Sequence, residues 1–255
     1  MFDLKKRRAL VTGAGQGMGV GIARCLALAG ATVYVNDLFL KRAERVASAM
    51  RDEGLDVNAK PFDVTDLSAF QTAVDEIGEI DILVSNAGVV LVEDKTEHFS
   101  SFADSTTENW HKQFNLNVFG VMNGVRAVLP AMRKNKWGRI VTISSDAGRK
   151  GIAGNVVYGA SKAAGIQLTK GIAVEEGTYG ITANTVSLGL MENSVAGNVS
   201  EEINAYFTAL LARTPISRPG KPADVGAAVH FLCSDEAEWI TGQNIPVNGG
   251  FDTFG

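Results

Sequence analysis

The sequence predicts a doubly wound α/β fold, in which a mostly parallel, seven-stranded sheet carries helices on both faces. Short β-rich runs alternate with longer helical patterns along the whole chain. Runs such as ALVT and ILVS are apolar at every position, as expected for strands that are buried on both faces. No proline- or serine-rich linker and no internal repeat interrupts the sequence, so we expect residues 1–255 to form a single domain.

The predicted elements follow from local composition and apolar spacing. Runs rich in β-branched residues predict strands at Ala9–Thr12, Thr32–Asn36, Val57–Lys60, Ile82–Ser85, Arg139–Ile143, Thr182–Val186 and Asn244–Val247. Apolar residues at helical spacing predict helices near residues 18–29, 41–53, 66–77, 107–134, 157–177 and 222–234. Right-handed crossovers between parallel strands then place helices on both faces of the sheet.

Composition argues against several classes of partner. The formal net charge is -4 and the pI is about 5.5, so no overall basic field exists to hold nucleic acid or an anionic membrane. The dense basic cluster Lys5–Arg8 runs directly into an apolar strand and is interpreted as its solvated lead-in. The N-terminus has no apolar leader, and no stretch approaches the roughly 20 apolar residues of a membrane span. We expect a soluble, cytoplasmic protein.

Cysteine and histidine usage predicts neither a disulfide nor a metal site. Cys25 and Cys233 lie far apart within probable helices, which favours reduced thiols. His98, His111 and His230 show no ligand spacing with one another or with a cysteine.

The long helix predicted at residues 107–134 is apolar on more than one face. Its apolar residues include Phe114, Leu116, Val118, Phe119, Val121, Met122, Val125, Val128, Leu129 and Met132. Such a helix must be buried on both sides, so we expect a second subunit to pack there and form a homo-oligomer, either a dimer or a tetramer.

A glycine-rich loop joins the first predicted strand to the first helix. Glycines at such a turn let the backbone approach a pyrophosphate, and the helix N-terminus presents free N–H groups to it. The loop residues expected to contact a dinucleotide are Gly13, Gln16, Gly17, Met18 and Gly19.

An acidic residue, Asp37, ends the second predicted strand. A carboxylate there is placed to accept hydrogen bonds from both hydroxyls of an adenosine ribose, and its charge would repel a 2′-phosphate. Asp37 therefore favours NAD over NADP. Lys41 and Arg42 follow closely and could soften the preference, although charge on a helix surface also explains them.

The pair Tyr158 and Lys162 lies four residues apart inside a small, apolar run, VVYGASKAAG. On a helix these positions share one face, and a cation beside a phenol lowers its pKa from about 10. Such a tyrosine could exchange protons near neutral pH. Taken alone, the pair also fits a lysine that snorkels beside a half-buried aromatic ring.

Together these motifs resemble the short-chain dehydrogenase/reductase family. The resemblance rests on the glycine loop, Asn86–Ala87–Gly88, Ser144–Ser145 and Tyr158-x-x-x-Lys162, and it covers nearly the whole chain. It implies a Rossmann fold and an oxidoreductase that interconverts a secondary alcohol and a ketone by hydride transfer with NAD(H).

The resemblance also implies the site residues. Ser145, thirteen residues before Tyr158, matches the serine that hydrogen-bonds the substrate oxygen. Tyr158 acts as general acid or base, Lys162 lowers its pKa and holds the nicotinamide ribose, and Asn117 anchors a water.

Further cofactor contacts are implied at the ends of other strands. Asp63 and Val64 match a pair that contacts adenine, and Asn86, Ala87 and Gly88 lie beside the cofactor. For Asp63, Val64 and Asn86, a simple turn or strand-end role is an open alternative.

After the sixth strand, Gly189, Leu190 and Met191 would contact the nicotinamide region. Leu188 stands where the family has proline, which predicts a looser hinge. Asn193 stands where the family has threonine and could still form a hydrogen bond.

Residues 188–214 resemble the family's substrate lid. The pattern of Ile203, Tyr206, Phe207, Leu210 and Leu211 predicts an amphipathic helix with an apolar inner face, which favours a hydrophobic or cyclic substrate.

Two other features leave alternatives open. The loop Leu91–Phe99 could shape the substrate pocket or be a plain surface loop. Arg149 could meet an anionic part of a substrate, such as the nucleotide of a thioester, or could simply be solvated.

Two other functions are compatible with the sequence. The chain could be a 3-oxoacyl-thioester reductase or the matching 3-hydroxyacyl-thioester dehydrogenase, acting on a coenzyme A or carrier-protein substrate. It could instead be a non-catalytic dinucleotide-binding protein, but such a binder needs neither Ser145 nor the Tyr158–Lys162 pair.

Overall fold

The computed structural model describes residues 1–88, 101–192 and 201–253, without the side chains of residues 201–204. Its centre is a seven-stranded sheet in the order β3-β2-β1-β4-β5-β6-β7, and every pair of neighbouring strands is parallel. The strands are β1 (Arg8–Val11), β2 (Thr32–Val35), β3 (Val57–Ala59), β4 (Ile82–Ser85), β5 (Gly138–Ser145), β6 (Ile181–Leu188) and β7 (Asn244–Val247). The predicted fold class is confirmed.

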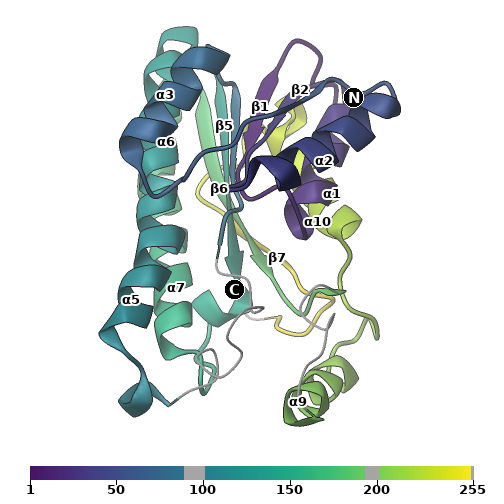
Figure 1. The fold of residues 1–255 in the computed structure, drawn as a ribbon, viewed down its shortest axis with the longest axis vertical. Coiled ribbons are helices and arrows are strands. Elements are labelled where there is room, and N and C mark those ends of the chain that lie inside the picture. The colour runs from purple at the N-terminus through teal and green to yellow at the C-terminus, as the bar shows by residue number, and fades with distance from the viewer. Residues whose placement is uncertain (89–100, 193–200, 254–255) are drawn as a thin grey trace.

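Helices cover both faces of the sheet, as Figure 1 shows. The main helices are α1 (Met18–Leu28), α2 (Leu40–Asp52), α3 (Leu67–Ile77), α5 (Thr107–Phe114), α6 (Gly120–Asn135), α7 (Val156–Glu176), α9 (Glu201–Ala212) and α10 (Pro222–Cys233). Helices α1, α2 and α10 form one layer, and α3, α6 and α7 form the other.

Each layer encloses its own apolar core. On one face, Ile22, Leu26 and Val229 are fully buried between the sheet and helices α1 and α10. On the other, Phe70 and Val128 are fully buried between the sheet and helices α3 and α6. Burial on both faces explains why the strands are apolar without alternation.

The helix predicted at residues 107–134 is interrupted. Helix α5 ends at Phe114, a π-helical turn spans Asn115–Phe119, and α6 begins at Gly120. A π turn holds one residue more than an α turn, so it changes the direction in which its side chains point. It places Asn117 toward the buried side of the helix, where the residue is 3% exposed.

The order of the strands places the candidate site. The chain reverses its direction of winding between β1 and β4, and ligands bind at the carboxyl ends of strands beside such a switch point. Ser145 of β5 pairs in register with Leu188 of β6, which pairs with Val247 of β7. The residues that follow these three strands therefore meet at one edge of the sheet.

Among the helices of the described residues, none has the combination of length and apolar character that crossing a membrane requires. The same part of the chain contains no group of three or more His, Cys, Asp or Glu side chains arranged to hold a metal ion.

Candidate active site

The glycine loop adopts a backbone that only glycine tolerates well. Gly13 and Gly17 have φ values of 61° and 60°, in the left-handed region. Helix α1 begins directly after Gly17, and no side chain caps its N-terminus. A Cβ atom at Gly15 would lie 2.5 Å from Oδ2 of Asp37. The loop therefore offers an uncapped helix N-terminus and closely approachable backbone, which is the cradle that a pyrophosphate needs.

Two neighbouring strand ends fix this loop. The Asn86 side chain donates from Nδ2 to the carbonyls of Thr12 (2.9 Å) and Gly13 (3.1 Å). Oγ1 of Thr12 in turn accepts the backbone N–H groups of Asn86 and Ala87, each at 3.0 Å. The predicted residues of the first and fourth strand ends are thus brought together, and Asn86 braces the loop.

Asp37 lies beside the glycine loop, where the ribose was predicted. The residue is 5% exposed, and its Oδ1 accepts the backbone N–H of Phe39 at 3.0 Å. Arg42 stacks over the Phe39 ring with its guanidinium 4.7 Å from the centroid. A Cβ atom at Gly15 would lie 2.8 Å from Cβ of Arg42, so this cation is close to the same loop.

Asp63 and Val64 end up at the carboxyl end of β3, with different environments. The exposed Asp63 accepts two hydrogen bonds within its own turn, from N and Oγ1 of Thr65, both at 2.8 Å. Val64 is buried near Gly120. The turn role that the sequence left open is therefore present at Asp63.

Ser145 and Tyr158 face each other. A hydrogen bond joins their side chains, and Ser145 Oγ also accepts the backbone N–H of Ala147 at 3.2 Å. Ser144, by contrast, is 3% exposed and donates to the Lys162 carbonyl at 3.1 Å, in the packing between β5 and α7. Of the two serines, only Ser145 meets the tyrosine.

Lys162 is buried next to Tyr158. The residue is only 8% exposed. Its Nζ donates to the Ile143 carbonyl at 3.2 Å and lies 5.8 Å from the centroid of the Tyr158 ring. Because burial disfavours the ammonium form, the pKa of Lys162 falls from 10.5 to about 8.

The prediction that Lys162 lowers the pKa of Tyr158 is wrong for this geometry. Burial raises the pKa of the half-buried phenol above its usual 10, and the hydrogen bond with Ser145 opposes that shift. The Lys162 ammonium donates to the Ile143 carbonyl. Burial therefore shifts the phenol toward its protonated form.

The Asn117 side chain is held by two hydrogen bonds from its nitrogen, and its oxygen has no protein partner. Its Nδ2 donates to Ser161 Oγ (2.9 Å) and to Gln113 Oε1 (3.2 Å). Its Oδ1 is buried without a protein hydrogen-bond partner. A Cβ atom at Gly88 would lie 3.3 Å from this oxygen and 3.1 Å from Nζ of Lys162. Asn117 and Lys162 thus border one small space beside Gly88, which suits a bridging water.

The segment after β6 packs against the residues that follow β7 and against Gly220. A Cβ atom at Gly189 would lie 2.7 Å from Cβ of Asn248, and the Leu190 carbonyl accepts the Gly220 N–H at 2.9 Å. Met191 is 3% exposed and forms a bridge with Gly220. Asn193 lies outside the described residues.

Both alternatives considered for Arg149 are wrong. Its side chain is 7% exposed and forms ion pairs with Asp146 (3.1 Å) and Asp252 (3.8 Å). It is neither solvated nor directed at an anionic substrate.

The amphipathic helix predicted within residues 188–214 is present as α9. Phe207 is buried and Tyr206 half-buried there, while the Ile203 side chain lies outside the described part. The loop Leu91–Phe99 and His98 lie outside it as well.

Sequence reasoning missed several residues that support the site. Gln113 and Ser161 hold Asn117, and Thr12 ties two strand ends together. Their spacing offered a signal: Gln113 stands four residues before Asn117, and Ser161 stands three after Tyr158, on shared helix faces. Asn248, which donates to Asp146, gave no such local signal.

The arrangement fits a nicotinamide dinucleotide. The loop between β1 and α1 provides the pyrophosphate cradle, Asp37 flanks it at the ribose end, and Lys162 borders the space beside Gly88. A phenol paired with a hydroxyl, next to a lysine with a lowered pKa, can move a proton to or from an oxygen placed between the two.

Comparisons with known proteins agree with this geometry. The family model described as enoyl-(acyl carrier protein) reductase matches residues 13–252. The oxidoreductase UcpA of Salmonella typhimurium is 35% identical over 260 residues, which cover 98% of this chain and 96% of that protein.

Two solved structures are also similar. A gluconate 5-dehydrogenase from Burkholderia cenocepacia, in complex with NADP and tartrate, has a TM-score of 0.87 and 33% identity, with 98% of this chain and 96% of that chain covered. A 3-oxoacyl-[acyl-carrier protein] reductase from Brucella melitensis, with bound NAD, has a TM-score of 0.89 and 31% identity, with coverages of 99% and 94%. With the fold, the site and these relatives in agreement, the chain belongs to the short-chain dehydrogenase/reductase family and is an oxidoreductase.

Proposed function

We propose that this protein interconverts a secondary alcohol and a ketone with NAD(H), and that Tyr158 is its proton-transfer group. The observation that carries the proposal is the hydrogen bond between Tyr158 and Ser145 beside the buried Lys162. A structural tyrosine needs neither a facing serine nor a buried lysine whose pKa is lowered to about 8.

Each residue has a role that follows from its surroundings. A bound nicotinamide would supply the hydride donor or acceptor. Ser145 holds the substrate oxygen, and Tyr158 donates a proton to that oxygen in the reduction direction or removes it in oxidation. Because Lys162 titrates near neutral pH, it can replace the proton of Tyr158, and a water held by the Asn117 Oδ1 would connect it to solvent.

Since burial shifts the phenol toward its protonated form, the resting site is ready for ketone reduction. Oxidation of an alcohol needs the phenolate and should therefore become faster as the pH rises. A panel of ketones and secondary alcohols, followed at the NADH absorbance band, tests both directions. Tyr158→Phe should lose turnover by about 100-fold or more while still binding the dinucleotide. Wild-type turnover in that variant would refute the proton-transfer role.

For the cofactor, NAD is proposed over NADP. The carboxylate of Asp37 lies beside the glycine loop and would repel a 2′-phosphate, whereas Arg42 is close enough to attract one. The two similar structures were solved with NADP and with NAD, so relatedness alone does not choose between them. Asp37→Ala should raise activity with NADPH relative to NADH, and Arg42→Ala should lower it. A wild-type preference for NADPH would overturn the assignment.

The proposed substrate is hydrophobic, because the lid helix α9 buries Phe207 and half-buries Tyr206. A second candidate function is reduction of 3-oxoacyl thioesters, which is supported by the similarity to the Brucella melitensis reductase. The buried, paired Arg149 gives that function no anion-binding group of its own. Acetoacetyl thioesters should be poorer substrates than simple ketones at equal concentration, and the reverse order would favour the second function.

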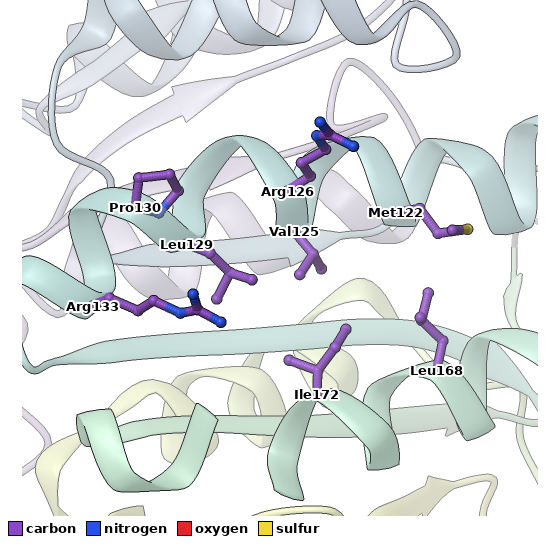
Figure 2. A pocket seen from close by; sticks show the side chains of 8 residues that line it. All are labelled: Met122, Val125, Arg126, Leu129, Pro130, Arg133, Leu168 and Ile172. Atoms are coloured by element: carbon purple, nitrogen blue, oxygen red, sulfur yellow. The ribbon is translucent and has the colours of Figure 1, made fainter. Parts of the chain in front are cut away.

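We also propose that the protein is a homo-oligomer that pairs through α6 and α7. A groove of about 450 Å³ lies between these helices, and Figure 2 shows the side chains that line it. The lining residues are Met122, Val125, Arg126, Leu129, Pro130, Arg133, Leu168 and Ile172. Met122 in α6 is 43% exposed, and Phe119, at the end of the π-helical turn before α6, is 50% exposed. We expect a second copy of the chain to cover these apolar side chains.

A second apolar feature favours a tetramer over a dimer. Trp239, in the segment before the edge strand β7, is 96% exposed, whereas α6 packs on the central strands β4 and β5. Sedimentation at micromolar concentration should give a mass above that of the monomer, and Leu168→Glu should reduce it. Wild-type sedimentation at the monomer mass would contradict the proposal.

A further inference from the structure

The C-terminal clamp, which we define as Asn248–Asp252, lies against the loop that follows Ser145. The strand register brings the two together, because Ser145 pairs with Leu188 and Leu188 with Val247. The Asn248 amide donates to Oδ2 of Asp146 and to the Asp252 carbonyl, both at 3.0 Å. Its oxygen accepts the Gly250 N–H at 3.1 Å. Both ends of this side chain are therefore engaged.

An ion network strengthens the connection. Arg149 pairs with Asp146 at 3.1 Å and with Asp252 at 3.8 Å, and Lys150 lies 3.6 Å from Asp252. The side chains of Asp146, Arg149 and Asp252 are only 5–7% exposed. Two carboxylates and two cations balance one another, and loss of Arg149 would leave two buried carboxylates with only the partly exposed Lys150 as counter-charge. Such a network holds its members in one arrangement.

Helix α7 holds the same loop from the other side. A Cβ atom at Gly159 would lie 2.6 Å from the Ala147 carbonyl oxygen, and one at Gly148 would lie 2.9 Å from the Lys162 backbone. The turn after Ser145 thus rests directly on the part of α7 that carries Tyr158 and Lys162. Contacts with α7 determine the distance between this turn and the helix, and the C-terminal clamp packs against the other side of the turn.

The clamp also contacts the end of the lid. The Ile216 N–H donates to the Gly249 carbonyl at 3.0 Å, and a Cβ atom at Gly250 would lie 3.1 Å from the Pro215 ring. The Arg213 guanidinium lies 5.8 Å from the centroid of the Phe251 ring. Residues 213–216 directly follow α9, which Figure 1 shows beyond the strand ends. The same five residues therefore touch the serine loop and the base of the lid.

We propose that the C-terminal clamp is a positioning element which, through Asp146 and Arg149, fixes the orientation of Ser145 toward Tyr158. This inference rests on the proposed function, because it assigns the clamp to the Ser145–Tyr158 pair. It also gives the lid a route to the serine: a displacement at residues 213–216 reaches Asp146 through Gly249 and Asn248.

The test is Asp252→Asn, which keeps the shape of the side chain and removes its charge. We expect kcat to fall about 10- to 100-fold, the loss typical of a misplaced reacting group, with unchanged affinity for the dinucleotide. Asp252→Glu keeps the charge and should recover most of the rate. Asp81→Asn is the matched control, since Asp81 pairs with Arg7 at 3.6 Å at the amino end of β4. It should leave kcat unchanged.

The pH profile separates positioning from simple electrostatics. The hydrogen bond from Ser145 lowers the pKa of Tyr158, so a displaced serine should move the rise of the oxidation rate to higher pH. Removal of a nearby carboxylate would, through charge alone, move that rise to lower pH. Lys162, the cation beside the phenol, is unchanged in all these variants.

A shift to lower pH, an unchanged kcat, or an equal loss in Asp81→Asn would each overturn the proposal. Tyr158→Phe, measured in parallel, keeps the two hypotheses apart. If that variant retains turnover, the proposed function fails. If it loses turnover and Asp252→Asn does not, only the clamp proposal fails.

Discussion

Replacing Lys162 with methionine should stabilise the protein at pH 7 while removing the proposed proton relay. The ammonium is buried in a residue 8% exposed, and its pKa falls from 10.5 to about 8. At 1.36 kcal/mol per pKa unit, keeping the group charged inside the fold costs about 3 kcal/mol. The variant loses the hydrogen bond from Nζ to the Ile143 carbonyl, which contributes about 1 kcal/mol. The expected gain in unfolding free energy is therefore about 2 kcal/mol.

The pH dependence of that gain has a definite sign. Between about pH 8 and pH 10.5 the unfolded chain still binds the Lys162 proton and the folded chain does not, so wild-type stability rises with pH in this window. The variant lacks this rise. Its advantage over the wild type should accordingly shrink by about 2 to 3 kcal/mol between pH 7 and pH 10.

Urea unfolding at both pH values measures this difference, and the comparison with the variant cancels all other titrating groups. Lys170→Met provides the control, because Lys170 is an exposed lysine on the same helix. If the advantage of Lys162→Met were the same at pH 7 and pH 10, the assignment of a buried lysine with a lowered pKa would be refuted.

Three other substitutions test separate parts of the structure. Gly15→Ala would bring a Cβ atom within 2.5 Å of Asp37 Oδ2, so dinucleotide affinity, measured by NADH fluorescence, should fall at least about 10-fold without loss of the fold. Phe70→Ala would open a cavity at a fully buried site between α3 and the sheet, and urea unfolding should show a loss of about 3 to 5 kcal/mol. Gly148→Ala would press on the backbone of Lys162 and Ala163, at about 2.9 Å, and should lower kcat with little change in NADH affinity.

Much of the fold could be predicted because its signals are local. The apolar runs that define β1 and β4 are buried on both faces, and nothing in their sequence competes with that reading. The strand ends then place Gly13, Ser145 and Gly189 at one edge, since parallel strands share a direction.

The remaining features depend on contacts between distant residues. Neither alternative for Arg149, contact with an anionic substrate or exposure to solvent, included its ion pair with Asp252. Asp252 is far along the chain, and only the register of β5, β6 and β7 brings the two together. The raised pKa of Tyr158 depends on its burial and on where the Lys162 amine points, which spacing on a helix does not determine.

The π-helical turn Asn115–Phe119 is an irregularity of the backbone that determines the orientation of one side-chain amide, that of Asn117. Deletion of one residue within it would allow unbroken α-helical hydrogen bonding and rotate everything upstream by about 100°. Gln113 would swing away from Asn117 with that rotation. A shortened helix would then be the more regular one, and the buried Asn117 Oδ1, which has no protein hydrogen-bond partner, would no longer be in place beside Lys162.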